Sequence, residues 1–321
     1  MSELLVEETA VAGAPAPSAR RLTLASAALA VVISAIWGTN PTALKLVLRG
    51  FPPMGSAGIR FALAAIGVAV WCWLTKTRLW PRPGEAVALS VNGGLFIAQI
   101  ATFTLGVYWG TASHSIVLLH TYPLFVVVLA HLLIPGDRAT PWKLAGLAAA
   151  FAGIVSLFAG GLAIHSPVHA GDGGWGGWQG SQLLGDITQV VSSFVLAVQV
   201  VYLKRMLERV HPDRAIFWQM ASGAVIFLGY SFAWEALGVQ HPGGLAVAAI
   251  VYQGLIIGTF CFTVWVWLLR RHRASVIAVF GFCGPVVGVA LSTLALREPF
   301  TPALGVSAAL VAAGVVLANL G

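Results

Sequence analysis

Charged residues are scarce in this sequence, and their scarcity excludes a water-soluble fold. Only 9% of the 321 residues are Asp, Glu, Lys or Arg, whereas 58% are hydrophobic. A soluble domain usually has about 25% charged residues. The net charge of +7 does not indicate nucleic acid as a partner, because the basic residues are spread over short segments between apolar runs. The composition therefore predicts a multi-pass protein of the lipid bilayer.

Cysteine is rare as well. The three cysteines, Cys72, Cys261 and Cys283, all lie in apolar runs. An odd number makes no disulfide framework, and no pair has the spacing of a metal site. The sequence shows no Ser-His-carboxylate set and no paired carboxylates at one depth. We therefore expect no enzyme activity, no metal and no cofactor.

Long apolar runs, in contrast, fill most of the chain. A helix needs about 20 residues to cross a hydrocarbon core of about 30 Å. Ten ranges have that length: 24–48, 53–74, 85–107, 112–133, 142–161, 182–204, 214–236, 245–269, 274–296 and 301–320. The sequence predicts an all-α membrane protein in which a glycine-rich linker separates two groups of five spans.

The basic residues indicate the orientation of these spans. Of 18 Lys and Arg, 14 lie on one side, Arg49 and Arg297 lie on the other, and Lys45 and Arg60 lie within spans. The positive-inside rule then places both termini in the cytoplasm. Residues 1–22 are expected to be a polar, Ala/Pro-rich cytoplasmic tail and not a signal peptide, because Glu3, Glu7 and Glu8 put acidic charge where a signal peptide has basic charge.

Two stretches of the chain resemble each other. Three residues recur with an offset of 162, namely Ala112, Ser113 and Pro123 as Ala274, Ser275 and Pro285. Three more recur with an offset of 161, namely Asp137, Pro141 and Gly153 as Glu298, Pro302 and Gly314. Five spans in each half would insert the halves in opposite orientations. We expect inverted repeats at 23–161 and 182–321, joined by an extracytoplasmic linker at 162–181.

Three stretches carry a family resemblance: "WGTNPTALKLVLRGFPPMGSAGIRFALAA" at 37–65, "YPLFVVVLAHLLIPGDRATPWKLAGLAAAFAGIVSL" at 122–157 and "GPVVGVALSTLALREPFTPALGVSAALVAAGVVL" at 284–317. They resemble the ten-helix EamA-type members of the drug/metabolite transporter superfamily. The matching hallmarks are the Trp37–Gly38 pair, Arg60 and the acidic turns at Asp137 and Glu298. The resemblance implies alternating access through a central cavity in a bacterial inner membrane, and export of amino acids or other small metabolites.

The first span is interrupted near its centre. Pro41 has no N–H, so the carbonyl of Trp37 loses its usual helical partner. Asn40 adds an amide beside it, and Gly38 allows close approach. We expect Trp37 and Asn40 to bind a polar group of the substrate; the alternative is a kink packed against a neighbouring helix.

Polar side chains on other spans extend this candidate site. Gln99 belongs to one helical face of its span, and Gln189 and Ser192 share a face of theirs; the alternative for both faces is a hydrogen-bonded seam between helices. The candidate substrate-binding residues are Trp37, Asn40, Gln99, His120, Tyr122, Gln189, Ser192, Tyr252 and Gln253. The candidate structural or gating residues are Gly38, Pro41, Arg60, Pro123, Pro285, Asp137 and Glu298.

Four of these side chains are expected to converge on one water-accessible cavity: Asn40, Gln99, His120 and Gln189. Truncation of each to Ala should weaken substrate binding by about 1–3 kcal/mol. Arg60 is expected to pair with helix-end carbonyls or with Asp186. No Asp or Glu lies at the centre of a span, so we expect transport not to require a membrane carboxylate; a proton relay through His120 stays open.

The substrate class follows from the uncharged candidates, which suit zwitterionic amino acids with aromatic or apolar side chains. The alternative is an antiporter of phosphorylated metabolites or nucleotide sugars. Phosphate would require Lys or Arg in the cavity, and only Lys45 and Arg60 lie within spans. A monomer is favoured over an oligomer.

We predict that both termini face the cytoplasm, because 14 of the 18 basic residues lie on that side. Reporter fusions after Gly321 and within residues 162–180 should report opposite sides of the membrane. Matching signals from the two fusions would contradict the ten-span topology.

Overall fold

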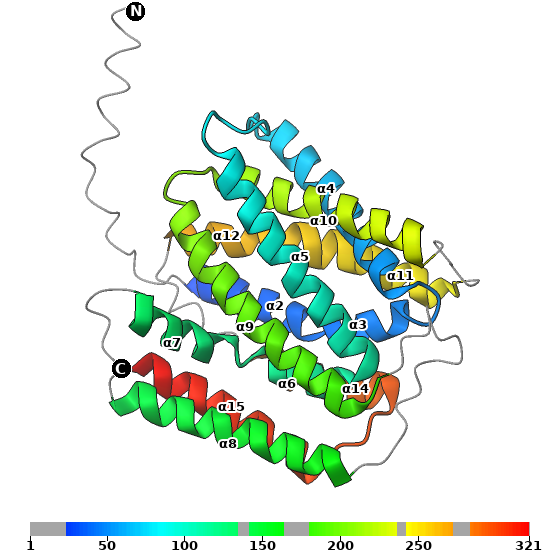
Figure 1. The fold of residues 1–321 in the computed structure, drawn as a ribbon, viewed down its shortest axis with the longest axis vertical. Coiled ribbons are helices and arrows are strands. Elements are labelled where there is room, and N and C mark those ends of the chain that lie inside the picture. Colours follow the sequence, from blue (N-terminus) through cyan, green and yellow to red (C-terminus); the bar gives the residue numbers. More distant parts are fainter. Residues whose placement is uncertain (1–23, 134–140, 164–179, 236–241, 272–282, 321) are drawn as a thin grey trace, which may run out of the picture.

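The computed structural model describes residues 24–133, 141–163, 180–235, 242–271 and 283–320, and their regular structure is helical (Figure 1). The first half contains α2 (Leu24–Gly38), α3 (Asn40–Val47), α4 (Pro53–Leu74), α5 (Ala86–Trp109), α6 (Ala112–Leu119), α7 (Tyr122–Leu133) and α8 (Pro141–Ala163). The second half contains α9 (Gln182–Met206), α10 (Pro212–Trp234), α11 (Gly244–Tyr252), η2 (Gln253–Cys261), α12 (Phe262–Arg271), α14 (Cys283–Leu296) and α15 (Pro302–Leu320).

Six of the described helical stretches are long and apolar enough to cross a membrane: Leu24–Val47, Pro53–Leu74, Ala86–Trp109, Gln182–Met206, Pro212–Trp234 and Gly244–Leu268. Shorter apolar helices lie at Leu144–Leu157, Gly284–Leu296 and Pro302–Gly314. The predicted all-α membrane class is therefore confirmed. The count of ten spans and the inverted repeat stay predictions.

Proline determines where several helices begin. Pro53, Pro141, Pro212 and Pro302 open α4, α8, α10 and α15. The first residues of a helix have no carbonyl to donate to, so a proline there sacrifices no hydrogen bond. The sequence therefore sets these helix starts locally.

The starts of α4 and α6 are also held by distant carboxylates. The Glu235 carboxylate accepts hydrogen bonds from the backbone N–H groups of Met54 and Gly55, at 3.0 and 2.9 Å, in the first turn of α4. The Glu298 carboxylate accepts from Ala112 and Ser113, at 2.8 and 2.9 Å, at the start of α6. Anionic groups are favourable at a helix N-terminus. Each contact ties a helix of the first half to a residue of the second half.

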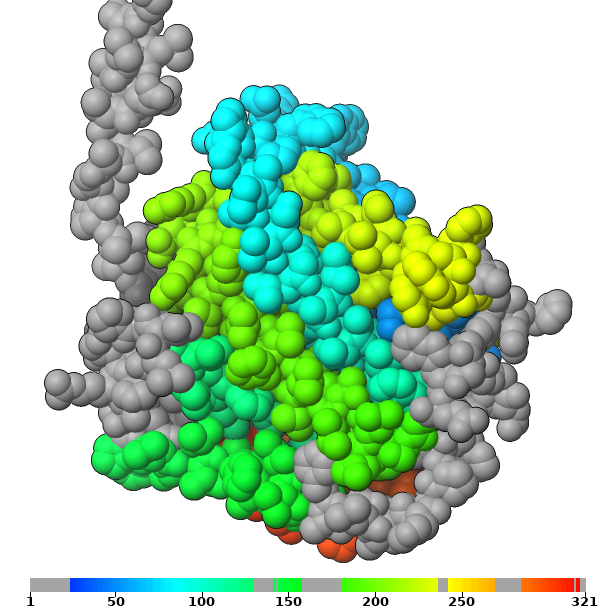
Figure 2. Space-filling model, viewed as in Figure 1, coloured from blue at the N-terminus to red at the C-terminus, as the bar shows by residue number. Residues whose placement is uncertain are grey.

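The helices pack mainly in pairs that join the two halves of the chain. The most extensive pairs are α8 with α15, α4 with α10, and α5 with α9. Figure 1 shows α8 beside α15 along one edge, and Figure 2 shows α5 and α9 side by side on the face in view. A hydrophobic core between α4, α5 and α10 includes Phe61, Phe96 and Phe227.

A charged contact braces α5 against α10. Arg214 donates through Nη1 to the Glu85 carboxylate, with 2.6 Å to Oε1, and the Arg82 N–H donates to Oε2 at 2.8 Å. Burial alone raises the pKa of the Glu85 carboxyl. The hydrogen bonds from the Arg82 backbone and from Arg214 outweigh it and hold that pKa below its ordinary range.

Two glycines that match in the sequence repeat lie in the same helix contact. A Cβ on Gly153 would lie 3.0 Å from the Ser307 carbonyl oxygen, and one on Gly314 would lie 2.5 Å from the Gly146 carbonyl oxygen. The backbones of α8 and α15 therefore approach closely at both points, as small residues permit in membrane helix pairs.

We predict that Gly314→Ala destabilises the protein by about 1–3 kcal/mol, because the added methyl group forces α8 and α15 apart. The matched control is Gly94→Ala in α5, where nothing lies within 4 Å of the new Cβ. This control should be neutral or slightly stabilising, because Ala favours helix over Gly. Thermal unfolding of purified protein, followed by tryptophan fluorescence, measures both. Equal Tm values for the two variants would contradict the close α8–α15 contact.

Candidate functional site

The predicted interruption of the first span is confirmed. Helix α2 ends at Gly38 and α3 begins at Asn40, with Thr39 as a turn residue between them. The Thr39 N–H and hydroxyl both donate to the Ile36 carbonyl, at 3.1 and 2.7 Å. These bonds close the end of α2, and Pro41 lies within the first turn of α3.

A second irregular segment, the π-helix η2, lies opposite this break. Gln253 Nε2 donates to Asn40 Oδ1 at 2.7 Å and contacts the Asn40 carbonyl oxygen at 3.3 Å. Thr39 Oγ1 and the Tyr252 hydroxyl are 2.7 Å apart. Because Thr39 already donates to Ile36, Tyr252 is the donor in this pair. Side-chain hydrogen bonds thus connect the break to the junction of α11 (Gly244–Tyr252) and η2, and π-helical turns are common at functional sites.

A third irregularity separates α6 from α7 at His120 and Thr121. His120 Nδ1 donates to the Ile116 carbonyl at 2.8 Å. A Cβ on Gly284 would lie 2.5 Å from His120 Nε2, and one on Gly38 would lie 2.9 Å from Gly284 Cα. Gly284 of α14 therefore touches both His120 and the break in the first span.

These three irregular segments meet around residues 38–40, which we call the broken-helix centre. Trp37 borders it, and its ring contacts Phe262 and Trp265 edge to face, at centroid distances of 5.6 and 5.1 Å. Interrupted helices at membrane depth are tolerated only where other protein groups or a cavity satisfy the backbone.

A separate polar contact lies between α5 and α9. Gln99 Nε2 donates to Ser192 Oγ at 3.1 Å, and Ser192 Oγ donates back to the Gln99 carbonyl at 3.1 Å. Gln189 is fully buried nearby, where a Cβ on Gly106 would collide with its Oε1. Neither amide atom of Gln189 has a protein partner among the described residues. Ser193 connects α9 to the α6–α7 break through Thr121 Oγ1 at 2.9 Å.

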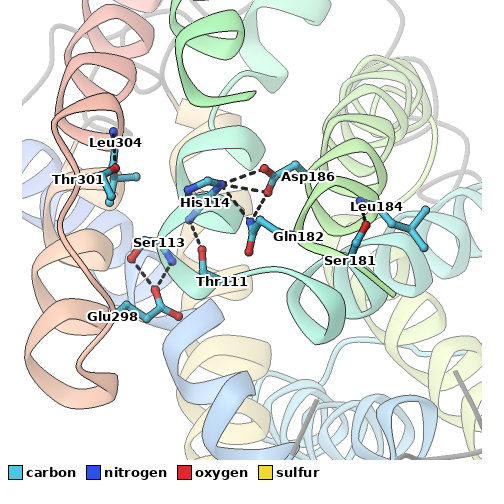
Figure 3. A network of polar contacts seen from close by, with 10 residues as sticks. All are labelled: Thr111, Ser113, His114, Ser181, Gln182, Leu184, Asp186, Glu298, Thr301 and Leu304. Carbon is cyan, nitrogen blue, oxygen red and sulfur yellow. Dashed lines mark hydrogen bonds and ion pairs between the residues drawn. The ribbon is translucent and has the colours of Figure 1, made fainter. Parts of the chain in front are cut away.

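A third polar cluster surrounds the start of α6, and Figure 3 shows it. His114 Nδ1 lies 2.9 Å from Asp186 Oδ2, and Gln182 Nε2 donates to Asp186 Oδ1 at 2.7 Å. Beside them, the Ser113 hydroxyl donates to Glu298 at 2.5 Å. The predicted pairing of Arg60 with Asp186 is therefore wrong, because His114 and Gln182 occupy that carboxylate.

The sequence model of the EamA-like transporter family matches residues 24–159 and 183–320. The chain belongs to this family.

Individual relatives are more distant. The uncharacterized transporter YoaV of Bacillus subtilis (strain 168) is 23% identical to this EamA-like chain over 290 residues, which cover 89% of it and 94% of YoaV. The uncharacterized inner membrane transporter YedA of Escherichia coli (strain K12) is 25% identical over 294 residues, covering 89% and 88%. A probable amino-acid metabolite efflux pump of Escherichia coli (strain K12) is 22% identical over 302 residues, covering 90% and 93%.

A solved crystal structure has a TM-score of 0.65 with 19% identity, covering 92% of this chain and 96% of its own. At this identity the likeness shows the fold alone. The family match, the inner-membrane relative and the apolar spans together identify a multi-pass transporter of the inner membrane.

The structure separates the predicted site residues of this EamA-like chain into two groups. The broken-helix centre brings together Trp37, Gly38, Asn40, Pro41, His120, Tyr252 and Gln253. Tyr122 and Pro123 begin α7, and Pro285 follows Gly284 in α14. Gln99, Gln189 and Ser192 lie at the α5–α9 contact instead. Asp137 lies outside the described residues. Substrate contact by any of these residues stays a prediction.

Sequence reasoning missed two features of the site region. Nothing in the local sequence linked His114 to Asp186, whose positions differ by 72 residues. Arg60 was expected to have a partner, yet its Nε and Nη2 atoms have none in the part of the chain that the structure describes. Its guanidinium lies over the Phe61 ring, 4.7 Å from the centroid.

We predict that the Asn40–Gln253 hydrogen bond supports transport as well as stability. A double-mutant cycle with Asn40→Ala and Gln253→Ala should give a coupling free energy of about 0.6–1.7 kcal/mol, as measured for hydrogen bonds between membrane helices. Thermal stability and transport by purified, reconstituted variants measure the two effects.

The matched control is the buried amide pair Asn92 and Gln219, which join α5 to α10 at 3.0 Å. Its loss should reduce stability to a similar degree and leave transport intact. Equal transport defects in the two cycles would show that the broken-helix centre has no special role.

Proposed function

We propose that this protein is a secondary transporter that exports small metabolites, with amino acids, including aromatic and apolar ones, as its substrate class. It works by alternating access through a central cavity between two inverted five-helix repeats at 23–161 and 182–321. The tail at 1–22 is cytoplasmic, and the linker at 162–181 is extracytoplasmic.

One observation carries this proposal: three helix interruptions are adjacent in space although they are far apart in the sequence. In secondary transporters, substrate sites are typically formed by discontinuous helices, whose exposed backbone and polar side chains replace water around the substrate. Residues 38–40, the His120 turn and the π-helix η2 provide that arrangement here.

The repeat architecture is supported by two further observations. The same family matches two ranges of similar length. The matched glycines, Gly153 and Gly314, each lie in the α8–α15 contact, as equivalent positions related by a two-fold axis would. An odd number of spans in each repeat would give the two halves opposite orientations, which alternating access uses.

Amino acids are supported by the chemistry of the broken-helix centre and by one relative. Asn40, Gln253, Thr39 and Tyr252 are uncharged donors and acceptors that can replace water around a zwitterion at less cost than fixed charges. One relative, which aligns with 90% of this chain, is named a probable amino-acid metabolite efflux pump. Phosphorylated substrates are less well supported, because the printed bonds at the broken-helix centre come from uncharged side chains and not from Lys or Arg, which phosphate requires.

We predict that proteoliposomes containing the purified protein accumulate labelled aromatic and branched-chain amino acids in counterflow, whereas labelled phosphorylated sugars are not taken up. The physical reason is that the side chains at the broken-helix centre, Thr39, Asn40, Tyr252 and Gln253, are uncharged, whereas a phosphate group calls for Lys or Arg. Liposomes without protein provide the background. Uptake of the phosphorylated sugars with none of the amino acids would overturn the assignment in favour of the antiporter.

A further inference from the structure

Arg60 is a buried cation, and two of its three guanidinium nitrogens have no hydrogen-bond partner among the described residues. Its side chain lies within α4, and the residue is 3% exposed. Neither Nε nor Nη2 has a hydrogen-bond partner among the described residues. An arginine keeps its charge under all ordinary conditions, and a buried charge is costly unless it is paired. The Phe61 ring beneath the guanidinium at 4.7 Å offsets only part of that cost.

The carboxylates of the described residues do not serve as its counter-ion. Those that are buried or cap a helix bind elsewhere: Glu85 to Arg214, Asp186 to His114, Glu235 to the start of α4 and Glu298 to the start of α6. A guanidinium presents a planar fork of N–H donors that matches a carboxylate. An anionic ligand would therefore satisfy Arg60.

Through its backbone, Arg60 lies against η2, the helix whose first residue bonds to Asn40 in the broken-helix centre. Helix η2 passes directly against α4 at this level, because a Cβ on Gly254 would lie 3.0 Å from the Arg60 carbonyl oxygen. The preceding residue, Gln253, donates through Nε2 to Asn40, while its buried Oε1 has no partner in the described part of the chain. Both Gln253 Oε1, an acceptor, and the Arg60 guanidinium, a cation, thus have atoms without a hydrogen-bond partner among the described residues.

Aromatic rings form a continuous path between the two locations. Phe61 contacts Phe96 at a centroid distance of 4.8 Å, Phe96 contacts Phe262 at 6.5 Å, and Phe262 contacts Trp37 at 5.6 Å. Trp37 adjoins the break at residues 38–40. A ligand bound between Arg60 and the break would meet apolar rings along this path.

We propose that Arg60 binds the carboxylate of the transported substrate, and that the substrate is a monocarboxylate with an apolar or aromatic body. This inference rests on the proposed transport function and assigns its anion-binding residue. For an amino acid, the Oε1 atom of Gln253 accepts a hydrogen bond from the ammonium group. A phosphate dianion is disfavoured because it would call for a second cation, and Lys45 is already bonded to the Tyr108 carbonyl.

Thermal unfolding of the full-length protein in detergent tests this assignment without requiring transport. The probes are phenylacetate, its neutral isostere phenylacetamide, and phenyl phosphate. A ligand that binds only the folded state raises Tm. We expect a dose-dependent rise with phenylacetate, little with phenylacetamide, and less with phenyl phosphate. Equal shifts for phenylacetate and phenylacetamide, no shift with any probe, or the largest shift with phenyl phosphate would overturn the proposal.

Variants of Arg60 test whether the rise in Tm with phenylacetate depends on this residue. Arg60→Gln should abolish the phenylacetate shift, and Arg60→Lys, which keeps the charge without the planar fork, should reduce it. The control Arg49→Gln, at an exposed arginine after α3, should keep the full shift. A phenylacetate shift that persists in Arg60→Gln would overturn the proposal. If Arg60→Gln does not fold, the Arg60→Lys variant and the response of the wild-type protein to the three probes still test the proposal.

Transport separates this inference from the function on which it rests. In proteoliposomes, Arg60→Lys should raise the KM for phenylalanine by at least about tenfold, as expected for a lost charge-assisted hydrogen bond. A wild-type protein that moves no amino acid but is stabilised by phenylacetate through Arg60 would overturn only the substrate class under Proposed function. Unchanged phenylalanine KM in Arg60→Lys would overturn the role of Arg60 alone.

Discussion

Every peptide group in the hydrocarbon core of a membrane must find its hydrogen-bond partner inside the protein. Pro41 leaves the Trp37 carbonyl without its helical donor, and the first span breaks between Gly38 and Asn40, where side chains supply further hydrogen bonds. The Thr39 hydroxyl closes the end of α2 on the Ile36 carbonyl, and Gln253 reaches the Asn40 backbone and side chain from η2. Helix η2 can come this close to α4 because Gly254 and Gly258 face Leu63 and Ala64.

Features that depend on local chemistry were predictable from the sequence. The apolar runs correspond to helices, the prolines at 53, 141, 212 and 302 begin four of them, and the break near Pro41 falls between Gly38 and Asn40. Each of these follows from hydropathy over one span or from a proline that lacks its donor. The all-α membrane class was therefore readable before any packing was known.

Features that depend on which helices become neighbours were not predictable. Asn40 and Gln253 are 213 positions apart, and Gln253 is the first residue of the π-helix η2, which hydropathy does not predict. The expected Arg60–Asp186 pair was wrong because a single sequence does not show which side chain becomes the neighbour of a carboxylate in the folded protein. His114, from the neighbouring α6, reaches it in the structure. Gln99 and Gln189 each belong to a polar face of their own span, but polarity alone does not distinguish a cavity wall from a helix contact.

The carboxylates that hold α4 and α6 have a consequence for the balance between conformations. Glu235 and Glu298 both belong to the second half of the chain and are half-buried. Their carboxylates accept hydrogen bonds from backbone N–H groups at helix starts in the first half. A surface carboxylate released from a helix N-terminus regains water, so each contact is worth only about 0.3–1 kcal/mol. A carrier must populate two states that differ by a few kcal/mol. Two weak contacts suit a small energy difference between states. Their hydrogen bonds can join the two halves in one state and be replaced by hydrogen bonds to water in the other, without a change in the apolar core.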